Sequence, residues 1–188
     1  MAKKESKEGL KERGRIEASN RILEAINRVF RERIMCDTEE QLGKVCLAVA
    51  EELTRSKFGY IGEINPAGRF DTTAMSDPGW DSCTYPESEI PILINNMEIR
   101  GIWGRVIKDG ESLIVNDPMA HPDSVGLPKE HPPLTSFLGV PLKQGTRTFG
   151  MISLGNKEGG YEESDREAIE ALAVAIWEAM RSKRTAEP

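Results

Sequence analysis

The chain has 188 residues, of which 30% are charged and 38% hydrophobic, and its formal net charge is −6. These values predict one soluble domain with a few additional helices, because the chain is too short for two well-cored domains. The negative charge argues against a nucleic-acid partner, and no apolar run approaches the roughly 18 residues of a membrane span. The N-terminus lacks the apolar core of a signal peptide, so we expect a cytoplasmic protein.

Residues 1–15 are almost entirely charged or small, and we expect them to be flexible. Residues 16–36 form a predicted helix, because apolar residues recur along them at heptad-related spacing. These residues are Ile16, Leu23, Ile26, Phe30 and Ile34. The stripe is narrow and shorter than three heptads, and it allows two interpretations. It either covers one side of the core or belongs to a signalling helix that pairs in a homodimer.

Residues 37–184 form the predicted main domain, and residues 185–188 form a short tail. The first helix of this domain begins at a capping box, Thr38-Glu39-Glu40-Gln41, and its apolar spacing places Cys46 on the buried face. Two strands follow, at 58–64 and 69–75. The intervening Asn-Pro-Ala-Gly turn predicts that they pair as a hairpin.

Two long irregular segments interrupt the second half of the chain. Loop 76–91 is rich in Asp, Ser, Pro and Gly, and loop 116–133 contains five prolines and both histidines. A helix over 99–109 and a short strand over 112–115 are predicted between them. Long loops within a compact domain are often binding loops or lids.

The segment 134–161 predicts a second hairpin, in which two apolar strands flank the turn Lys-Gln-Gly-Thr at 143–146. The last helix is predicted to begin at Ser164, with a capping box Ser164-Asp165-Arg166-Glu167. Its basic C-terminal end suits the helix dipole.

This order of elements resembles a GAF domain over roughly residues 37–181. The hairpin at 134–161 carries the resemblance together with four shorter stretches: KFGYIGEI at 57–64, PGWD at 78–81, RGIWG at 100–104 and IVNDP at 114–118. They resemble the GAF domains of bacterial and archaeal sensor histidine kinases. The resemblance implies an α/β fold of the α+β type, with a central antiparallel sheet of about five to six strands. The N- and C-terminal helices are then expected on one face of the sheet and a ligand pocket on the other.

The resemblance also implies a non-catalytic module that senses a small molecule, held between the sheet and the loops 76–91 and 116–133. Trp103 and Phe137 also suit the core, whereas Trp80, in a polar loop, is the better pocket candidate. The implied partners are a small-molecule ligand, a second copy through the terminal helices, and a histidine kinase or another signalling protein in trans. The candidate ligand-binding residues lie in or beside the loops: Met75, Trp80, Cys83, Tyr85, Trp103, Ser136 and Phe137.

The cofactor is unknown at this point, and haem is one possibility. Some archaeal sensor kinases of this type carry haem attached through a loop cysteine, with histidine proposed as an iron ligand. The matching cysteine is Cys83, and the histidine candidates are His121 and His131. A Cys-x-x-Cys-His motif is absent, and each histidine precedes a proline in a polar loop, where a turn or solvent-facing role is the ordinary interpretation.

Two other functions are compatible with the family. A ligandless dimerisation or scaffold module would fill its pocket with its own side chains. The free methionine sulfoxide reductases, a catalytic GAF family, use cysteines. Here Cys36 and Cys46 lie in the helical N-terminal part and no cysteine follows Cys83, so the thiols are not expected to converge. The sequence contains no catalytic constellation, and we expect no enzyme.

Overall fold

The structure is a computed structural model that describes residues 7–76, 94–127 and 133–185. Its helices are α1 (Lys7–Met35), α2 (Glu39–Thr54), α4 (Gly101–Asp109) and α5 (Glu163–Arg184). Its strands are β1 (Phe58–Ile64), β2 (Phe70–Met75), β3 (Leu113–Val115), β4 (Phe137–Gln144) and β5 (Arg147–Gly155). The mixed α/β fold with a five-stranded antiparallel sheet confirms the predicted class.

The sheet has the strand order β2-β1-β5-β4-β3, and every neighbouring pair is antiparallel. The two predicted hairpins are present, and the long hairpin β4–β5 lies in the middle of the sheet. A two-residue turn joins β4 to β5, and its Gly145 has a φ of 62°, which glycine adopts without steric cost.

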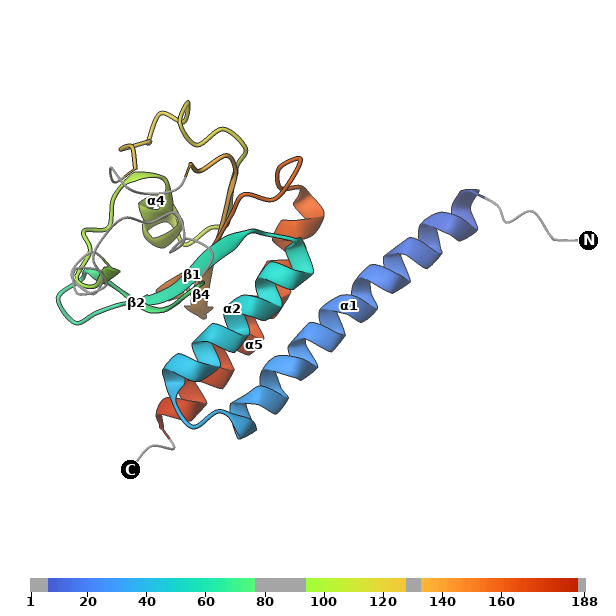
Figure 1. The fold of residues 1–188 in the computed structure, drawn as a ribbon, viewed down its shortest axis with the longest axis horizontal. Coiled ribbons are helices and arrows are strands. Elements are labelled where there is room, and N and C mark those ends of the chain that lie inside the picture. The colour runs from blue at the N-terminus through green and yellow to red at the C-terminus, as the bar shows by residue number, and fades with distance from the viewer. Residues whose placement is uncertain (1–6, 77–93, 128–132, 186–188) are drawn as a thin grey trace, which may run out of the picture.

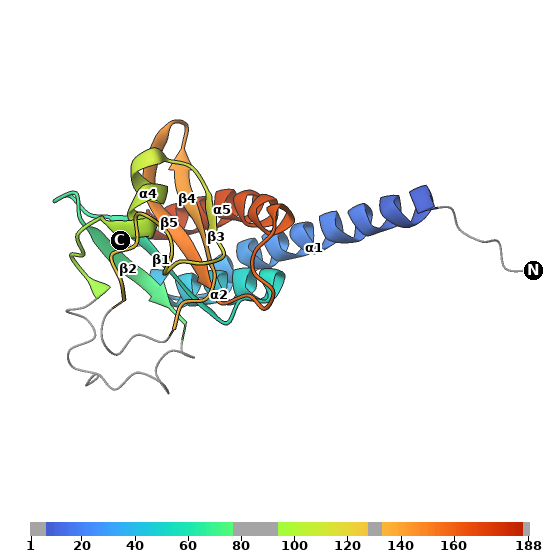
Figure 2. The ribbon, with the colours of Figure 1, turned by 90° about the horizontal axis from the view of Figure 1, so that it is seen from above.

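Helices cover the two faces of the sheet unequally (Figures 1 and 2). α2 and α5 pack on one face, and α1 packs in turn on α2 and α5, whereas α4 lies over the opposite face. The main core lies between the sheet and the helices α2 and α5. It includes Leu42, Leu47, Ile61, Leu138, Ile152, Leu154, Ile169, Leu172 and Ile176, all essentially inaccessible to solvent.

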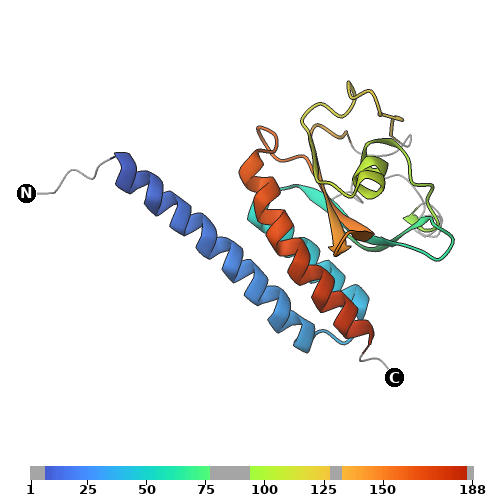
Figure 3. The same cartoon turned by 180° about the vertical axis from the view of Figure 1, so that it is seen from behind.

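The boundaries of the terminal helices differ from the sequence prediction. α1 begins at Lys7, before the predicted start at Ile16, because Lys, Glu, Arg and Leu are all good helix formers and suit an exposed helix. Its N-terminal part extends beyond the rest of the domain (Figure 3).

The predicted cap of α5 at Ser164 was wrong. The helix begins at Glu163, and the carboxylate of Asp165 accepts a hydrogen bond from the backbone N–H of Glu162 at 2.8 Å. Asp165 thus satisfies the helix terminus from the third helical position, as a capping-box side chain does. The cap of α2 at Thr38 is confirmed, because Gln41 N donates to Thr38 Oγ1 at 3.2 Å.

Candidate functional site

The sheet face under α4 carries a second apolar cluster, separate from the main core. Alternation along the strands sends every second side chain to this face. The buried members come from both the sheet and α4: Phe70, Ile102, Val106, Ile107, Val115, Phe137 and Met151. Partly buried side chains pack around them, including Tyr60, Met97, Ile99 and Trp103.

Aromatic rings form the centre of this cluster. The rings of Phe70 and Trp103 lie 5.3 Å apart at an interplanar angle of 55°, and Tyr60 meets Phe70 edge-on at 6.0 Å. Met75 is paired with Tyr60 in the β1–β2 register, so both side chains belong to the same face. The result is an aromatic surface that extends from α4 to the end of β2.

Two side chains on this apolar face, Tyr60 and Ser153, carry hydroxyl groups that can form hydrogen bonds. Tyr60 is the register partner of Ser153, and the two side chains form a hydrogen bond. Burial raises the pKa of the Tyr60 phenol, while the bond to Ser153 acts in the opposite direction. Tyr60 therefore stays neutral at physiological pH and can donate or accept a hydrogen bond.

The predicted ligand-binding residues are distributed over three settings. Met75, Trp103 and Phe137 belong to the face under α4, where Phe137 is buried and Trp103 is partly buried. Ser136 is buried, and its hydroxyl donates to the carbonyl of Lys157 at 3.3 Å, so it contributes to a loop contact. Trp80, Cys83, Tyr85 and His131 lie outside the described residues.

Tyr60 and Ser153 were missed by sequence reasoning. Tyr60 lies in a strand whose alternation with buried Ile61 predicts which face it occupies. Ser153 stands between Ile152 and Leu154, and its placement opposite Tyr60 depends on the β1–β5 register. That register cannot be derived from either strand alone.

His121 lies in a local turn on the loop that follows β3. The backbone N–H of Asp123 donates to His121 Nδ1 at 3.2 Å, and Asp123 Oδ2 lies 3.1 Å from Arg105 Nη1 on α4. This arrangement leaves Nε2 as the ring nitrogen open to a metal or another partner. Among the residues that the structure describes, no group of three or more His, Cys, Asp or Glu side chains is arranged to hold a metal ion.

The two described cysteines lie in the helical layers, away from α4. Cys46 is fully buried in the main core, and burial raises its pKa to about 12. Cys36 follows α1, and its pKa is raised first by burial and then by the charge of Glu32. Neither thiol has the lowered pKa of a reactive cysteine.

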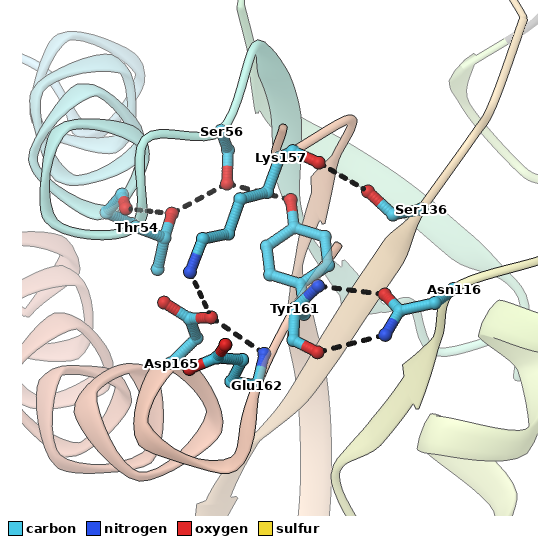
Figure 4. A network of polar contacts seen from close by, with 9 residues as sticks. Thr54, Ser56, Asn116, Ser136, Lys157, Tyr161, Glu162 and Asp165 are labelled. Atoms are coloured by element: carbon cyan, nitrogen blue, oxygen red, sulfur yellow. Dashed lines mark hydrogen bonds and ion pairs between the residues drawn. The ribbon is translucent and has the colours of Figure 1, made fainter. Parts of the chain in front are cut away.

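A network of polar contacts joins the loops around the site to α5 (Figure 4). Asn116, directly after β3, makes two bonds to the backbone of Tyr161. Tyr161 N donates to Asn116 Oδ1 at 2.8 Å, and Asn116 Nδ2 donates to Tyr161 O at 3.0 Å. The phenol of Tyr161 lies 2.8 Å from Ser56 Oγ, which in turn lies 2.6 Å from Thr54 Oγ1 at the end of α2.

The same network holds the segment between β5 and α5. Lys157 Nζ donates to Asp165 Oδ2 at 2.5 Å, and Asp165 caps α5 as described above (Figure 4). Asn156, with a φ of 60°, donates from Nδ2 to the carbonyl of Pro133 at 2.7 Å and accepts from Thr135 N at 2.8 Å. Two asparagines therefore fix the two ends of loop 116–133 to the chain that enters α5.

An open groove of about 510 Å³ lies elsewhere, at the β4 side of the sheet beside α5. Apolar and charged residues line it, among them Val140, Pro141, Lys143, Arg166 and Val174. It is therefore distinct from the aromatic face under α4.

Comparison with known proteins decides the family. The family model described as "GAF domain" matches residues 36–181. The chain is a GAF domain. The observed sheet and helices thereby confirm the resemblance drawn from the hairpin at 134–161.

Relatives of this GAF domain include a sensor. This chain is 29% identical over 143 residues to the methyl sulfide methyltransferase-associated sensor of Methanosarcina acetivorans, and the match covers 73% of this chain. The match spans only 14% of that protein's length.

Solved structures share the fold at low sequence identity. The GAF domain of a phosphoenolpyruvate-protein phosphotransferase from Coxiella burnetii aligns with a TM-score of 0.73 at 16% identity, over 90% of this chain and 97% of that one. Free methionine-R-sulfoxide reductase from Neisseria meningitidis, in complex with its substrate, aligns with a TM-score of 0.65 at 18% identity, over 88% of this chain and 91% of that one. Among the described parts of this chain, no helix combines the length and apolar character needed to cross a membrane.

Proposed function

We propose that this GAF domain is a non-catalytic sensor that binds a small molecule between the sheet and the loops 76–91 and 116–133. The observation that carries the proposal is the aromatic face under α4 with its Tyr60–Ser153 hydroxyl pair. Concave sites for small molecules combine mostly apolar walls with a few placed polar groups, and this face has that composition. GAF domains are in general ligand-binding modules of signalling proteins, and a relative is a sensor.

The chemistry of the face suggests the class of ligand. Its described members are aromatic, aliphatic or sulfur-containing, and their polar groups, the two hydroxyls and the indole N–H of Trp103, are uncharged. Such a surface favours an uncharged molecule with an apolar body and one hydrogen-bonding group, because an ion would lose its hydration without compensation.

The contacts of α5 suggest how binding reaches the helical layer. Its N-terminal end is connected through Tyr161 and Asn116 to loop 116–133. Near its C-terminal end, Lys183 Nζ donates to Cys36 O at 2.5 Å, and Arg184 pairs with Glu39 of α2 and Glu63 of β1. A ligand that displaces Asn116 at the start of this loop would shift Tyr161 and the position of α5, and thereby its contacts with α1 and α2.

The proposal extends to the output of the domain. The domain acts as a cytoplasmic homodimer through its terminal helices and passes its state to a histidine kinase or another signalling protein. A purified sample tests the sensing role directly. A thermal-shift screen with uncharged aromatic and aliphatic compounds should give ligands that raise the midpoint of wild type and lose most of that effect in Tyr60→Phe/Ser153→Ala.

Haem is the specific ligand suggested by the resemblance, with Cys83 as the attachment point and His121 or His131 as an iron ligand. His121 Nε2 is compatible with that role, since Nδ1 is used within its turn. Hemin reconstitution should then give a Soret band that survives acid-acetone extraction and is lost in Cys83→Ala. An extractable or absent band excludes covalent haem and leaves the apolar ligand class above.

A ligandless scaffold is the alternative, since side chains already pack densely around Phe70. It predicts no ligand from the same screen. Methionine sulfoxide reduction has less support, because Cys36 and Cys46 lie in the helical layers and the likeness to the reductases is one of fold.

A further inference from the structure

The face of α1 that points away from α2 and α5 carries an exposed apolar stripe. Ile16, Leu23, Phe30 and Ile34 are 53%, 54%, 43% and 77% exposed. The face that packs on the domain contains the buried Ala25 and Val29. At about 100° per residue, the exposed stripe lies on roughly the opposite side of the helix.

Two asparagines complete this stripe. Residues 16, 20, 23, 27, 30 and 34 follow one another in alternating steps of four and three, which is heptad spacing. In heptad terms, Ile16, Leu23 and Phe30 occupy d positions, whereas Asn20 and Asn27 occupy a positions and are exposed. In two-stranded parallel coiled coils, a buried asparagine at position a fixes register and oligomeric state.

The helix also continues where the domain no longer supports it. Residues 10–17 are exposed on every side, and this part of α1 projects away from the sheet and helices (Figures 1 and 3). A short helix without packing is marginal in water, so a partner along this arm would contribute to its stability.

We propose that a second copy of the chain packs on this stripe, parallel and in register, with Asn20 facing Asn20 and Asn27 facing Asn27. A parallel pair places position a against a and d against d. Each asparagine then faces the same asparagine of the second copy, whose amide supplies both a donor and an acceptor. An antiparallel pair places a against d, and each asparagine would then face an apolar side chain and lose water without a partner. The orientation thus follows from the asparagines.

This inference deepens the homodimer of the proposed function, on which it rests for the presence of a second copy, but it requires no ligand. Because the C-terminal half of α1 packs on the domain, the parallel pair places both domains at the same end of the helices. A shift of α5 in either copy would then act on a shared helix pair.

The association is tested by sedimentation equilibrium of the full chain without added ligand. Leu23→Glu places two carboxylates in one layer and removes two leucines, and it should weaken the dimer about a hundredfold or more. Arg21→Glu introduces the same side chain away from the stripe, and should change the dissociation constant less than about threefold. A monomeric wild type, or equal effects of the two variants, overturns the proposal.

Orientation is tested by disulfide crosslinking in a Cys36→Ser/Cys83→Ser background. The parallel dimer predicts that Leu23→Cys alone forms a covalent dimer on oxidation. An antiparallel pair centred on the stripe would instead crosslink only when Leu23→Cys is mixed with Asn27→Cys, which contradicts the proposal.

The role of the asparagines has its own readout. Asn20→Leu/Asn27→Leu should tighten association at least about tenfold and also allow the antiparallel crosslink, because the polar layers that fix register are gone. Unchanged association would place the asparagines outside the interface. None of these experiments uses a ligand, so their failure leaves the sensing role to be judged separately.

Discussion

Replacing Asn116 by alanine should destabilise the domain by about 3 kcal/mol, because its amide makes two bonds to the backbone of Tyr161. Each bond contributes about 1 kcal/mol net, and a buried N–H or C=O left without a partner costs about 1–3 kcal/mol. Partial access of water reduces that second cost, which gives a total of about 2–4 kcal/mol. For a domain of this size, the loss corresponds to a decrease of roughly 6–12 °C in the melting temperature.

Urea unfolding followed by tryptophan fluorescence measures this effect. The midpoint should fall while the slope stays constant, since the surface exposed on unfolding does not change. Asn95→Ala is the matched control, because Asn95 is exposed, and it should stay within about 0.5 kcal/mol of wild type. A loss below about 1 kcal/mol for Asn116→Ala would refute the view that this side chain ties the loop to α5.

Three further predictions concern other parts of the fold. Cys46 should resist alkylation in the folded protein, since its pKa of about 12 keeps it a thiol, and rapid labelling found by mass-spectrometric mapping would contradict this. The contribution of Cys46 to folding stability should decrease as the pH rises from the ordinary thiol pKa of 9.0 toward 12, because only the unfolded chain loses the proton in that range. Gly150→Ala should lower the free energy of unfolding by about 3 kcal/mol or more, because a Cβ there would lie 2.1 Å from a backbone carbonyl oxygen of β1. Gly14→Ala on α1 should raise it by about 0.5–1 kcal/mol in the same urea assay, because a Cβ there meets open space. Arg184→Gln should cost about 1–2 kcal/mol and remove part of the salt dependence of stability, because the guanidinium is half-exposed while its two glutamate partners are largely covered. A loss that does not change with salt would be inconsistent with the exposure of Arg184.

Local sequence patterns predicted the element order and most strand boundaries. The capping box at Thr38 and the hairpin turn at Gly145 act through neighbouring residues, so they could be recognised without the tertiary fold. The predicted start of α5 was wrong because Asp165 binds two partners at once, the backbone N–H of Glu162 and the ammonium group of Lys157. Only the folded connection brings Lys157 to that position.

The candidate site could be predicted only in part, because local patterns indicate single residues but not the contacts between distant segments. Met75, Trp103 and Phe137 could be selected as apolar or aromatic residues near loops. The Tyr60–Ser153 pair depends on the register of strands that are far apart in sequence, and the role of Asn116 depends on a contact with Tyr161, which lies across the hairpin. Local patterns do not encode such long-range pairings.

The most direct test of the sensing role is the thermal-shift screen carried out in parallel on wild type and Tyr60→Phe/Ser153→Ala. The account predicts that uncharged compounds with one hydrogen-bonding group raise the midpoint of wild type in a saturable manner, and that the double variant loses most of this shift while remaining folded. Absence of any stabilising compound, or equal stabilisation of both proteins, would contradict a ligand site at the hydroxyl pair under α4.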